Sequence, residues 1–289
     1  MNPAPSVILF TVLSGLGFGL LAFLGLGLPA PQGGVAFWTW GLGYGLAVGG
    51  LTASTFHLGN PQRALLAFTQ WRTSWLSREA WASVATLLVL APVALSDWLR
   101  LDWPRGFGVV GAVMALATVG ITSMIYAQLK TVPRWNHWPT PALFVGFALT
   151  GGALLSGHGA LAAGLSLGLA GVLAVGFRLG DGRFAARGQD IGKATGLGGI
   201  GGVRVFEQVH TADNYLLREM MFGVGRKHAD RLRQIAVVAV ALPGALLLAP
   251  HSLGLLGLAL VCHVTGALAA RWLFFAQAEH VVGLFYGRR

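Results

Sequence analysis

Charged residues are scarce in this sequence. Asp, Glu, Lys and Arg make up 10% of its 289 residues, against about 25% in a typical soluble domain. Hydrophobic residues make up 55%, and the mean hydropathy is +0.67. A soluble enzyme of this length needs far more surface charge, and a disordered chain contains far fewer apolar residues. The composition therefore indicates an integral membrane protein.

Cysteine is also nearly absent. The one cysteine, Cys262, lies in an apolar segment, which excludes a disulfide framework and a zinc site built from several thiolates. An iron–sulfur cubane needs about four thiolates. A b-type haem needs two histidines on facing helices, but of the eight histidines only His263 lies well inside an apolar run. We therefore expect no haem and no iron–sulfur cluster in this chain, and no metal site.

Eight apolar runs approach the roughly 20 residues that a bilayer-spanning helix needs. They predict an all-α integral membrane protein, a single membrane domain of residues 1–289 that forms a bundle of eight transmembrane helices. The expected helices cover residues 7–28, 36–56, 79–95, 107–129, 141–156, 161–179, 235–249 and 253–283. Small-residue spacing at Gly41, Gly45 and Gly49 predicts close helix packing along the second of them.

The basic residues predict the orientation of this bundle. Eight spans place both termini and the loops after the second, fourth and sixth helices on one side. That side carries all 20 Lys and Arg residues except Arg100, Arg105 and the intrahelical Arg271. The positive-inside rule then places both termini and the long loops in the cytoplasm, in a bacterial inner membrane. A basic face that docks an acidic partner subunit is the alternative, whereas nucleic-acid binding is a poor explanation of the +10 net charge.

The longest connection, residues 180–233, is predicted to be a cytoplasmic loop. Its first half is rich in glycine, and residues 214–222 resemble a short amphipathic helix. A loop of this length in a compact bundle is usually functional or disordered. We interpret it as a candidate partner-docking element or an interfacial segment.

Ionisable residues around the second and third helices form the first candidate site. His57 ends the second helix and Glu79 begins the third, so both are expected at one depth, near the cytoplasmic edge. A histidine can hydrogen-bond a quinone carbonyl there, and a carboxylate can carry the protons that accompany two-electron transfer. A structural role is the alternative, because Glu79 in a first turn suits the helix dipole and His57 can cap the last carbonyls.

Two further segments carry polar groups into apolar runs. Tyr126, at the end of the fourth helix, can reach a quinone at that depth. Arg271 and Glu279 lie about two turns apart in the last run, so they would share a helix face. They can pair with each other or border a site.

The order and spacing of several motifs resemble the membrane-anchor subunits of dimethyl sulfoxide reductase complexes, an eight-helix family related to polysulfide reductase anchors. The matching stretches are His57-Leu-Gly-Asn-Pro61, Leu76-Ser-Arg-Glu79, Thr131-Val-Pro133 through Trp138-Pro-Thr-Pro141, His210-Thr-Ala-Asp-Asn-Tyr-Leu-Leu-Arg-Glu219 and Arg271-Trp-Leu-Phe-Phe275. The resemblance implies a haem-free anchor that binds menaquinone or ubiquinone. It also implies two partners: a four-cluster iron–sulfur subunit and a catalytic subunit that carries molybdopterin.

The resemblance also suggests roles for individual residues. In the family, the histidine that ends the second helix and the glutamate that opens the third are tied to quinol binding and oxidation, and they correspond to His57 and Glu79. We expect Glu79 to transfer protons, and Arg63, Arg72 and Tyr126 to complete the quinone-binding set. The expected partner-docking residues are Arg78, Arg134 and Arg218. No catalytic residue is expected in this chain.

The predicted orientation bears on the reaction. The best-known dimethyl sulfoxide reductases carry their catalytic subunits on the outer face, whereas the matching loops here are predicted to face the cytoplasm. This arrangement is similar to that of the sulfite dehydrogenase complexes, whose anchors belong to the same family. The expected function is a non-catalytic, quinone-reactive anchor subunit that couples sulfite oxidation to quinone reduction. The alternatives are an anchor that oxidises menaquinol for dimethyl sulfoxide reduction, a secondary transporter and a b-type cytochrome.

Overall fold

The computed structural model describes residues 1–57, 60–207, 220, 228–248 and 252–286, without the side chains of His57 and Pro61. Within these ranges the chain is helical and contains no strand. The helices are α1 (Pro5–Gly25), α2 (Gly34–Ala53), α3 (Trp75–Leu99), α4 (Gly106–Ala127), α5 (Pro139–Leu155), α6 (Gly159–Ala186), α7 (Ile191–Thr195), α8 (Ala229–Leu246) and α9 (Leu253–Ala276). Three 3₁₀ segments are η1 (Ser54–His57), η2 (Pro61–Phe68) and η5 (Val281–Tyr286).

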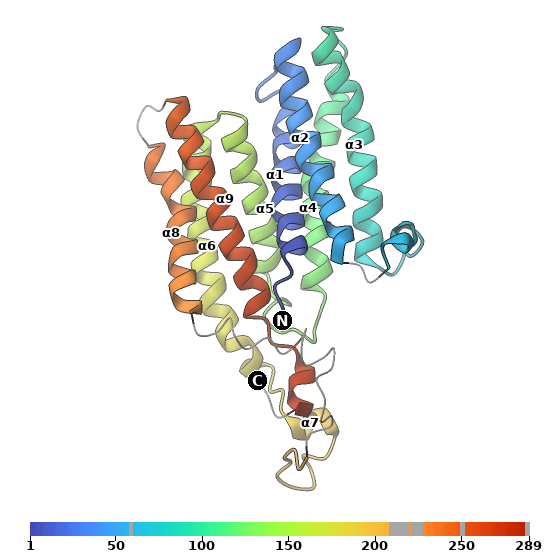
Figure 1. The fold of residues 1–289 in the computed structure, drawn as a ribbon, viewed down its shortest axis with the longest axis vertical. Coiled ribbons are helices and arrows are strands. Elements are labelled where there is room, and N and C mark those ends of the chain that lie inside the picture. The colour runs from blue at the N-terminus through green and yellow to red at the C-terminus, as the bar shows by residue number, and fades with distance from the viewer. Residues whose placement is uncertain (58–59, 208–219, 221–227, 249–251, 287–289) are drawn as a thin grey trace.

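Each expected apolar run coincides with one long helix of this bundle (Figure 1). Among the described residues, five helices are long and apolar enough to cross a membrane, namely α1, α3, α4, α6 and α9, and α5 is apolar but shorter. Helices α2 and α8 do not belong to these five. Helix α2 contains many glycine and aromatic residues in place of aliphatic ones, and α8 begins with the charged residues Asp230, Arg231 and Arg233. The all-α membrane class is therefore supported, whereas the count of eight spans stays a prediction.

Helix α1 lies at the centre of the bundle, with 78% of its apolar window buried. It approaches its neighbours backbone to backbone. A Cβ atom at Gly17 would lie 2.3 Å from the amide nitrogen of Ala47 in α2, and one at Gly19 would lie 2.0 Å from the carbonyl oxygen of Ala148 in α5. These glycines are required for close packing. The prediction of close packing at Gly41, Gly45 and Gly49 is wrong, because a Cβ there meets nothing within 4 Å.

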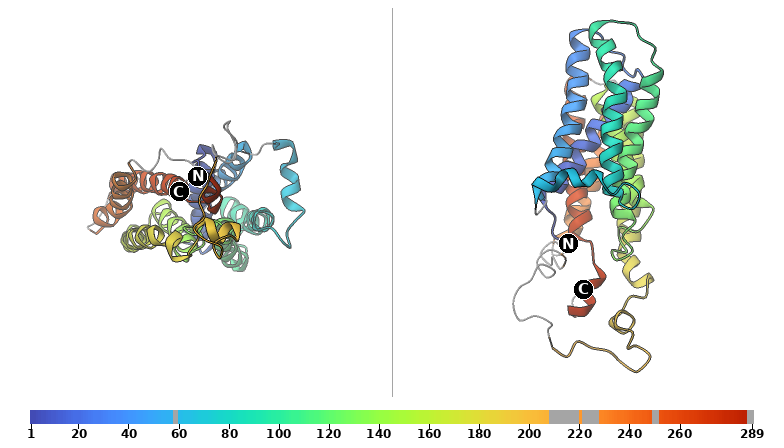
Figure 2. Two further views of the ribbon diagram at one scale, coloured as in Figure 1. Left: turned by 90° about the horizontal axis from the view of Figure 1, so that it is seen from below. Right: turned by 90° about the vertical axis from the view of Figure 1, so that its right-hand side faces the viewer.

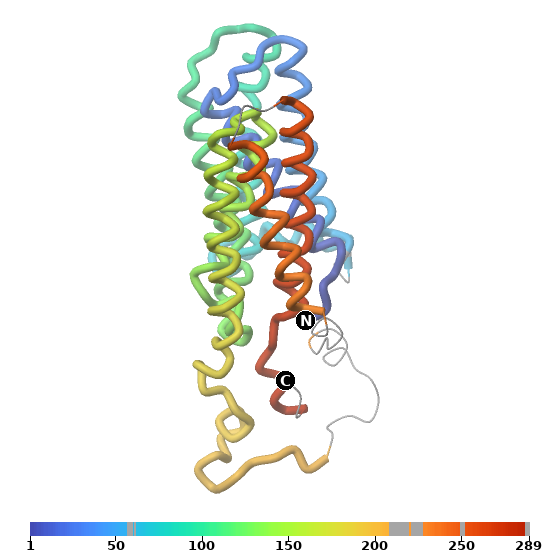
Figure 3. The backbone as a smooth tube through the Cα atoms, turned by 90° about the vertical axis from the view of Figure 1, so that its left-hand side faces the viewer, coloured from blue at the N-terminus to red at the C-terminus, as the bar shows by residue number. Residues whose placement is uncertain are grey.

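The connection after α6 is more helical than the sequence predicts. Helix α6 continues past residue 179 to Ala186, and the short helix α7 follows and contacts η5 below the bundle (Figure 3). At the other end of the connection, Arg233 already belongs to α8. The amphipathic helix expected at 214–222 lies outside the described residues except for Met220, and so does Arg218.

Candidate functional site

A cavity of about 590 Å³ lies at the end of the bundle that holds the N-terminus. Its walls come from segments that are distant in sequence: the N-terminal residues, η1, η2, the start of α3 and the ends of α4 and α9. The lining residues include Met1, Asn2, Val7, Phe10, Ser54, Thr55, Arg63, Ala64, Ala67, Leu76, Ile125, Tyr126, Leu129, Trp135 and Phe275. Small-molecule sites span about 300–1,000 Å³ and are mostly apolar with few polar groups, which matches this cavity.

The outer wall is η2, which runs across the bundle rather than along it, beside the start of α3 (Figure 2). Pro61 begins this segment, where its missing N–H leaves no bond unmade. Arg63, Ala64 and Ala67 face the cavity. Leu65 and Leu66 point away, with exposed fractions of 78% and 58%. The segment thus separates the cavity from an outer surface that is itself apolar.

The turn that enters α3 is held by its own side chains. The Ser77 N–H donates to the Ser74 hydroxyl at 3.5 Å, which caps the helix. The Arg78 guanidinium donates to the carbonyls of Trp71 at 3.1 Å and Arg72 at 2.7 Å. Arg78, expected to dock a partner, therefore braces the entry to α3. Arg72, expected to bind quinone, places its guanidinium over the Trp71 ring and is not among the residues that line the cavity.

Glu79 is buried one turn into α3, with 4% of its surface exposed. The Thr122 hydroxyl of α4 donates to its carboxylate, and Tyr126, one turn further along the same face of α4, interacts with it electrostatically. No Lys, Arg or His nitrogen among the described residues lies within 4.0 Å of this carboxylate. A buried carboxylate without a cationic partner is costly in an apolar bundle and is typically functional.

Tyr126 joins Glu79 to the cavity, because it lines the cavity wall. Aromatic packing fixes its ring: the rings of Trp135, Phe144, Phe274 and Phe275 have centroids 5.3–5.7 Å away. The Trp135 indole also donates to the Phe274 carbonyl at 2.8 Å, which ties the α4–α5 turn to α9. This cluster holds Tyr126 between the buried carboxylate and the cavity.

The structure thus brings together three of the five residues expected to bind quinone. Arg63 and Tyr126 line the cavity, and Glu79 lies behind Tyr126. His57 closes η1, whose residues Ser54 and Thr55 line the cavity, but its side chain lies outside the described part of the chain. Its role stays a prediction.

Two parts of the site were not predicted from the sequence. Thr122 shares the α4 face of Tyr126, and the four-residue spacing of Thr118, Thr122 and Tyr126 is a signal that could have revealed it. The N-terminal residues gave no such signal. Met1 reaches the site because its ammonium group donates to the Ala278 carbonyl at 2.9 Å, a contact between the two ends of the chain.

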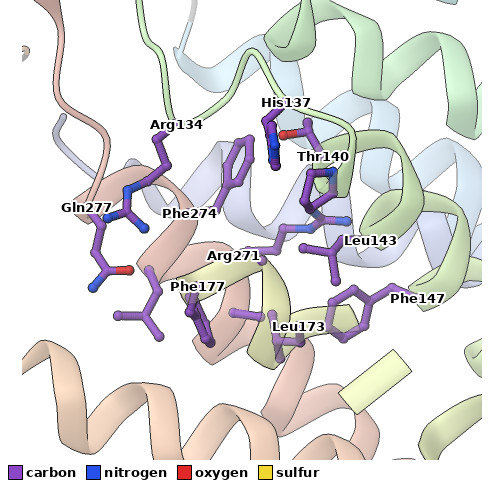
Figure 4. Close-up of a pocket in the computed structure, with 14 residues that line it drawn as sticks. Arg134, His137, Thr140, Leu143, Phe147, Leu173, Phe177, Arg271, Phe274 and Gln277 are labelled. Atoms are coloured by element: carbon purple, nitrogen blue, oxygen red, sulfur yellow. The ribbon is translucent and has the colours of Figure 1, made fainter. Parts of the chain in front are cut away.

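A second, smaller cavity of about 50 Å³ lies between the start of α5 and the ends of α6 and α9 (Figure 4). Arg271 of α9 and Gln277, which follows the last residue of α9, line it together with Arg134 and His137 from the α4–α5 turn. Burial, and secondarily the positive charge of Arg183, lower the pKa of His137 below its usual range. His137 is therefore neutral at pH 7, and the charge of this cavity comes from its arginines.

Arg134, expected to dock a partner, forms a salt bridge within the chain, and its docking role stays a prediction. Its guanidinium lies 2.5 Å from the Asp181 carboxylate of α6, and Arg233 of α8 lies at the same distance from it. The expectation that Arg271 and Glu279 share one helix face is wrong, because α9 ends at Ala276 and Glu279 lies beyond it.

With this geometry established, similarity to known proteins identifies the class. Residues 1–175 match the family described as "DMSO reductase anchor subunit (DmsC)". The chain belongs to this family, and it is therefore a membrane-anchor subunit of the molybdopterin oxidoreductase type. Membership of this family implies that the chain assembles with a catalytic subunit and an iron–sulfur subunit in one complex.

A known protein is similar to the chain over its whole length. One of the subunits of the sulfite dehydrogenase of Allochromatium vinosum is 30% identical, and the match covers 99% of both chains. No solved structure matches the chain significantly.

Proposed function

We propose that this chain is the quinone-reactive anchor of a sulfite-oxidising complex, and that the 590 Å³ cavity binds the quinone. The observation that carries the proposal is the buried Glu79 carboxylate, which accepts a hydrogen bond from the Thr122 hydroxyl of α4 and interacts electrostatically with Tyr126 of the cavity wall. The full-length likeness to a sulfite dehydrogenase subunit favours sulfite as the electron source.

The cavity suits a molecule with a polar ring and a long apolar tail. Arg63, Tyr126 and the hydroxyls of Ser54 and Thr55 supply hydrogen-bonding groups for ring carbonyls of menaquinone or ubiquinone. The remaining walls are largely aliphatic and aromatic, which suits an isoprenoid tail. The apolar outer face of η2 would lie in the membrane interface, where a quinone enters from the lipid.

The chemistry requires protons at this site. Sulfite takes an oxygen atom from water and releases two electrons and two protons, and a quinone takes up two electrons and two protons to become a quinol. Glu79 supplies protons to the bound ring through Tyr126 or an intervening water, and it is reprotonated from the aqueous side. The electrons arrive from the four-cluster iron–sulfur subunit, which receives them from the molybdopterin subunit.

The orientation and the docking surface form part of the same proposal. Both termini, the 180–233 connection and the cavity face the cytoplasm of a bacterial inner membrane, in line with the excess of Lys and Arg on that side. The iron–sulfur subunit docks on this side. Because sulfite oxidation and quinone protonation then share one side of the membrane, the reaction by itself separates no charge.

The test is Glu79→Gln in the assembled complex. Turnover with quinone should fall about 100-fold or more, since positioned proton transfer contributes about 10²–10⁴-fold. Sulfite oxidation with a soluble dye that accepts electrons from the partner subunits should continue unchanged. The matched control is Asp97→Asn, which alters the buried carboxylate at the opposite end of α3. Normal quinone turnover in Glu79→Gln would contradict the assignment.

The family name favours a second substrate, because the matched model describes dimethyl sulfoxide reductase anchors. The two candidates separate when the complex is purified through this chain in mild detergent. Molybdenum with many irons and no haem spectrum supports the anchor assignment in either case. Quinone reduction by sulfite then supports the first candidate, and menaquinol oxidation by dimethyl sulfoxide supports the second.

A further inference from the structure

The small cavity of Figure 4 holds a buried positive charge for which the described part of the chain supplies no counter-ion. Arg271 is 4% exposed, and its guanidinium lies over the rings of Phe144 at 3.5 Å and Phe147 at 5.5 Å from their centroids. Its side chain extends along the cavity toward His137 and Thr140 (Figure 4). No carboxylate of the described residues lies within 4.0 Å of it, although buried charges are normally paired.

The surroundings of Arg271 add positive charge. Arg134 and Arg233 share the carboxylate of Asp181, and Arg233 also lies 3.6 Å from the exposed carboxylate of Asp230. Arg183 and Arg187 both donate to Asn136, a neutral residue, and the Nε of Arg183 is buried without a hydrogen-bond partner among the described residues.

The start of α5, at Pro139 and Thr140, also lines the cavity and turns the positive end of its helix dipole toward it. The residues that line the cavity include Arg134 and Arg271 and no Asp or Glu, which favours an anionic occupant.

The space and its apolar rim define the kind of anion. A buried water needs about 10–15 Å³ measured in the same way, so 50 Å³ holds a few waters or one group the size of a phosphate. Leu143 and Phe177 line the cavity next to its charged residues. Trp138, Val175 and Leu179 are exposed on the nearby surfaces of α5 and α6. A polar head and an apolar tail would thus both find complementary surfaces.

We propose that this cavity binds the phosphate group of an anionic phospholipid, with an acyl chain along the surface between α5 and α6. Basic pockets between membrane helices on the cytoplasmic side are typical sites for such headgroups, and tryptophan is enriched at the same depth. The bound phosphate neutralises Arg271 and joins α5, α6 and α9. The proposal does not depend on quinone chemistry, because the ligand would occupy this cavity alone, although Arg271 also interacts electrostatically with Tyr126 of the larger cavity.

The experiment uses the full-length chain in its complex, purified in detergent and then supplied with one lipid at a time. The lipids are dioleoylphosphatidylglycerol and dioleoylphosphatidylcholine, and inorganic phosphate is tested separately. The readouts are the phospholipid retained in native mass spectra and the thermal midpoint. For the wild type we expect retained phosphatidylglycerol and a higher midpoint with that lipid, and no effect of phosphatidylcholine.

Two variants and one control distinguish the site from general lipid effects. Arg271→Gln removes the buried charge and should weaken phosphatidylglycerol binding at least tenfold. Gln277→Glu is nearly isosteric and places a carboxylate in the cavity, so it should expel the lipid even if Arg271→Gln fails to assemble. Arg178→Gln, which removes an exposed arginine of α6 outside the cavity lining, should behave like the wild type.

Two outcomes would overturn the proposal. One is equal retention of phosphatidylglycerol by all these proteins, which would mean that the lipid binds elsewhere. The other is full protection by inorganic phosphate alone with no further effect of the lipid, which would make the cavity a site for a free anion.

Discussion

Helix α3 carries a buried carboxylate at each end, and the two have opposite surroundings. Asp97, 7% exposed, accepts from the Arg105 guanidinium at 2.6 Å and from the Trp40 indole at 3.1 Å. Glu79 accepts from the neutral Thr122 hydroxyl and faces Tyr126. The first carboxylate is neutralised and links α2 and α3 to the residue that precedes α4, whereas the second has no cationic partner among the described residues. Burial alone therefore does not suggest a functional group, and it is the missing cationic partner beside a cavity that supports the proposal for Glu79.

The largest expected effects separate the two carboxylates: substitution of Asp97 should lower the stability of the protein, and substitution of Glu79 should lower its turnover with quinone. Asp97→Asn should lower the free energy of unfolding by about 2 kcal/mol, because it breaks a partly buried ion pair whose arginine is 37% exposed. The apparent Tm of the complex should fall by about 5 °C. Quinone turnover per assembled complex should stay normal. Thermal unfolding monitored by tryptophan fluorescence checks the first effect, and a loss of quinone turnover would remove the contrast.

Glu79→Gln should show the reverse pattern in the same measurements. The Thr122 hydroxyl can donate to the amide oxygen as it does to the carboxylate, so the apparent Tm should change by no more than about 1 °C. A large drop in Tm would mean that Glu79 is a structural group like Asp97.

Tyr126→Phe should have an intermediate effect. The phenylalanine ring keeps the packing against the four neighbouring aromatic rings, so only the hydroxyl is lost. A hydrogen bond of about 1–1.5 kcal/mol corresponds to a decrease of about five- to tenfold in kcat/KM for quinone. Steady-state kinetics with a short-chain quinone measures this decrease. An unchanged kcat/KM would place the hydroxyl outside the path between Glu79 and the ring.

The smallest expected effect distinguishes two arginines that were both predicted to bind quinone. Arg63 lines the cavity, whereas Arg72 stacks on Trp71 away from it. Arg63→Gln should raise KM for quinone about threefold, since an exposed charge contributes at most about 1 kcal/mol, and Arg72→Gln should leave KM unchanged. The two variants serve as each other's control. Equal changes in KM would indicate that only the overall charge of the surface matters.

The sequence predicted the parts of this site that depend on helix ends. Apolar runs end where the bilayer ends, so Glu79 and His57 were expected at one depth and Tyr126 within reach of a quinone, and the structure brings Glu79 and Tyr126 together. The positions of the N-terminal residues and of η2 depend on tertiary packing and carry no periodic signal. Counting charges also gives no information on contacts within the chain. Arg78 and Arg134, expected to dock a partner, bind the Trp71 and Arg72 carbonyls and Asp181, so their docking role stays a prediction.

Two errors about helix length have simple physical causes. Helix α6 was expected to end at residue 179, where charged residues begin, but it continues because Asp181 pairs with Arg134 and Arg233. Helix α9 was predicted to extend as far as residue 283 because the apolar run does. It ends at Ala276. Beyond it, the Val281 N–H donates to the Thr131 carbonyl at 3.0 Å. Hydropathy locates a helix in the membrane, whereas contacts outside the membrane decide where it ends.

On the proposed mechanism Glu79 gives up its proton when quinone is reduced and is reprotonated afterwards. Time-resolved infrared difference spectroscopy of the assembled complex, started by reduction of the bound quinone and recorded before reprotonation is complete, measures this transfer through the carboxyl stretching band. We expect a transient carboxyl band in the difference spectrum that is lost in Glu79→Gln and kept in Asp97→Asn. A spectrum without a carboxyl band, or one whose band persists in Glu79→Gln, would contradict this mechanism.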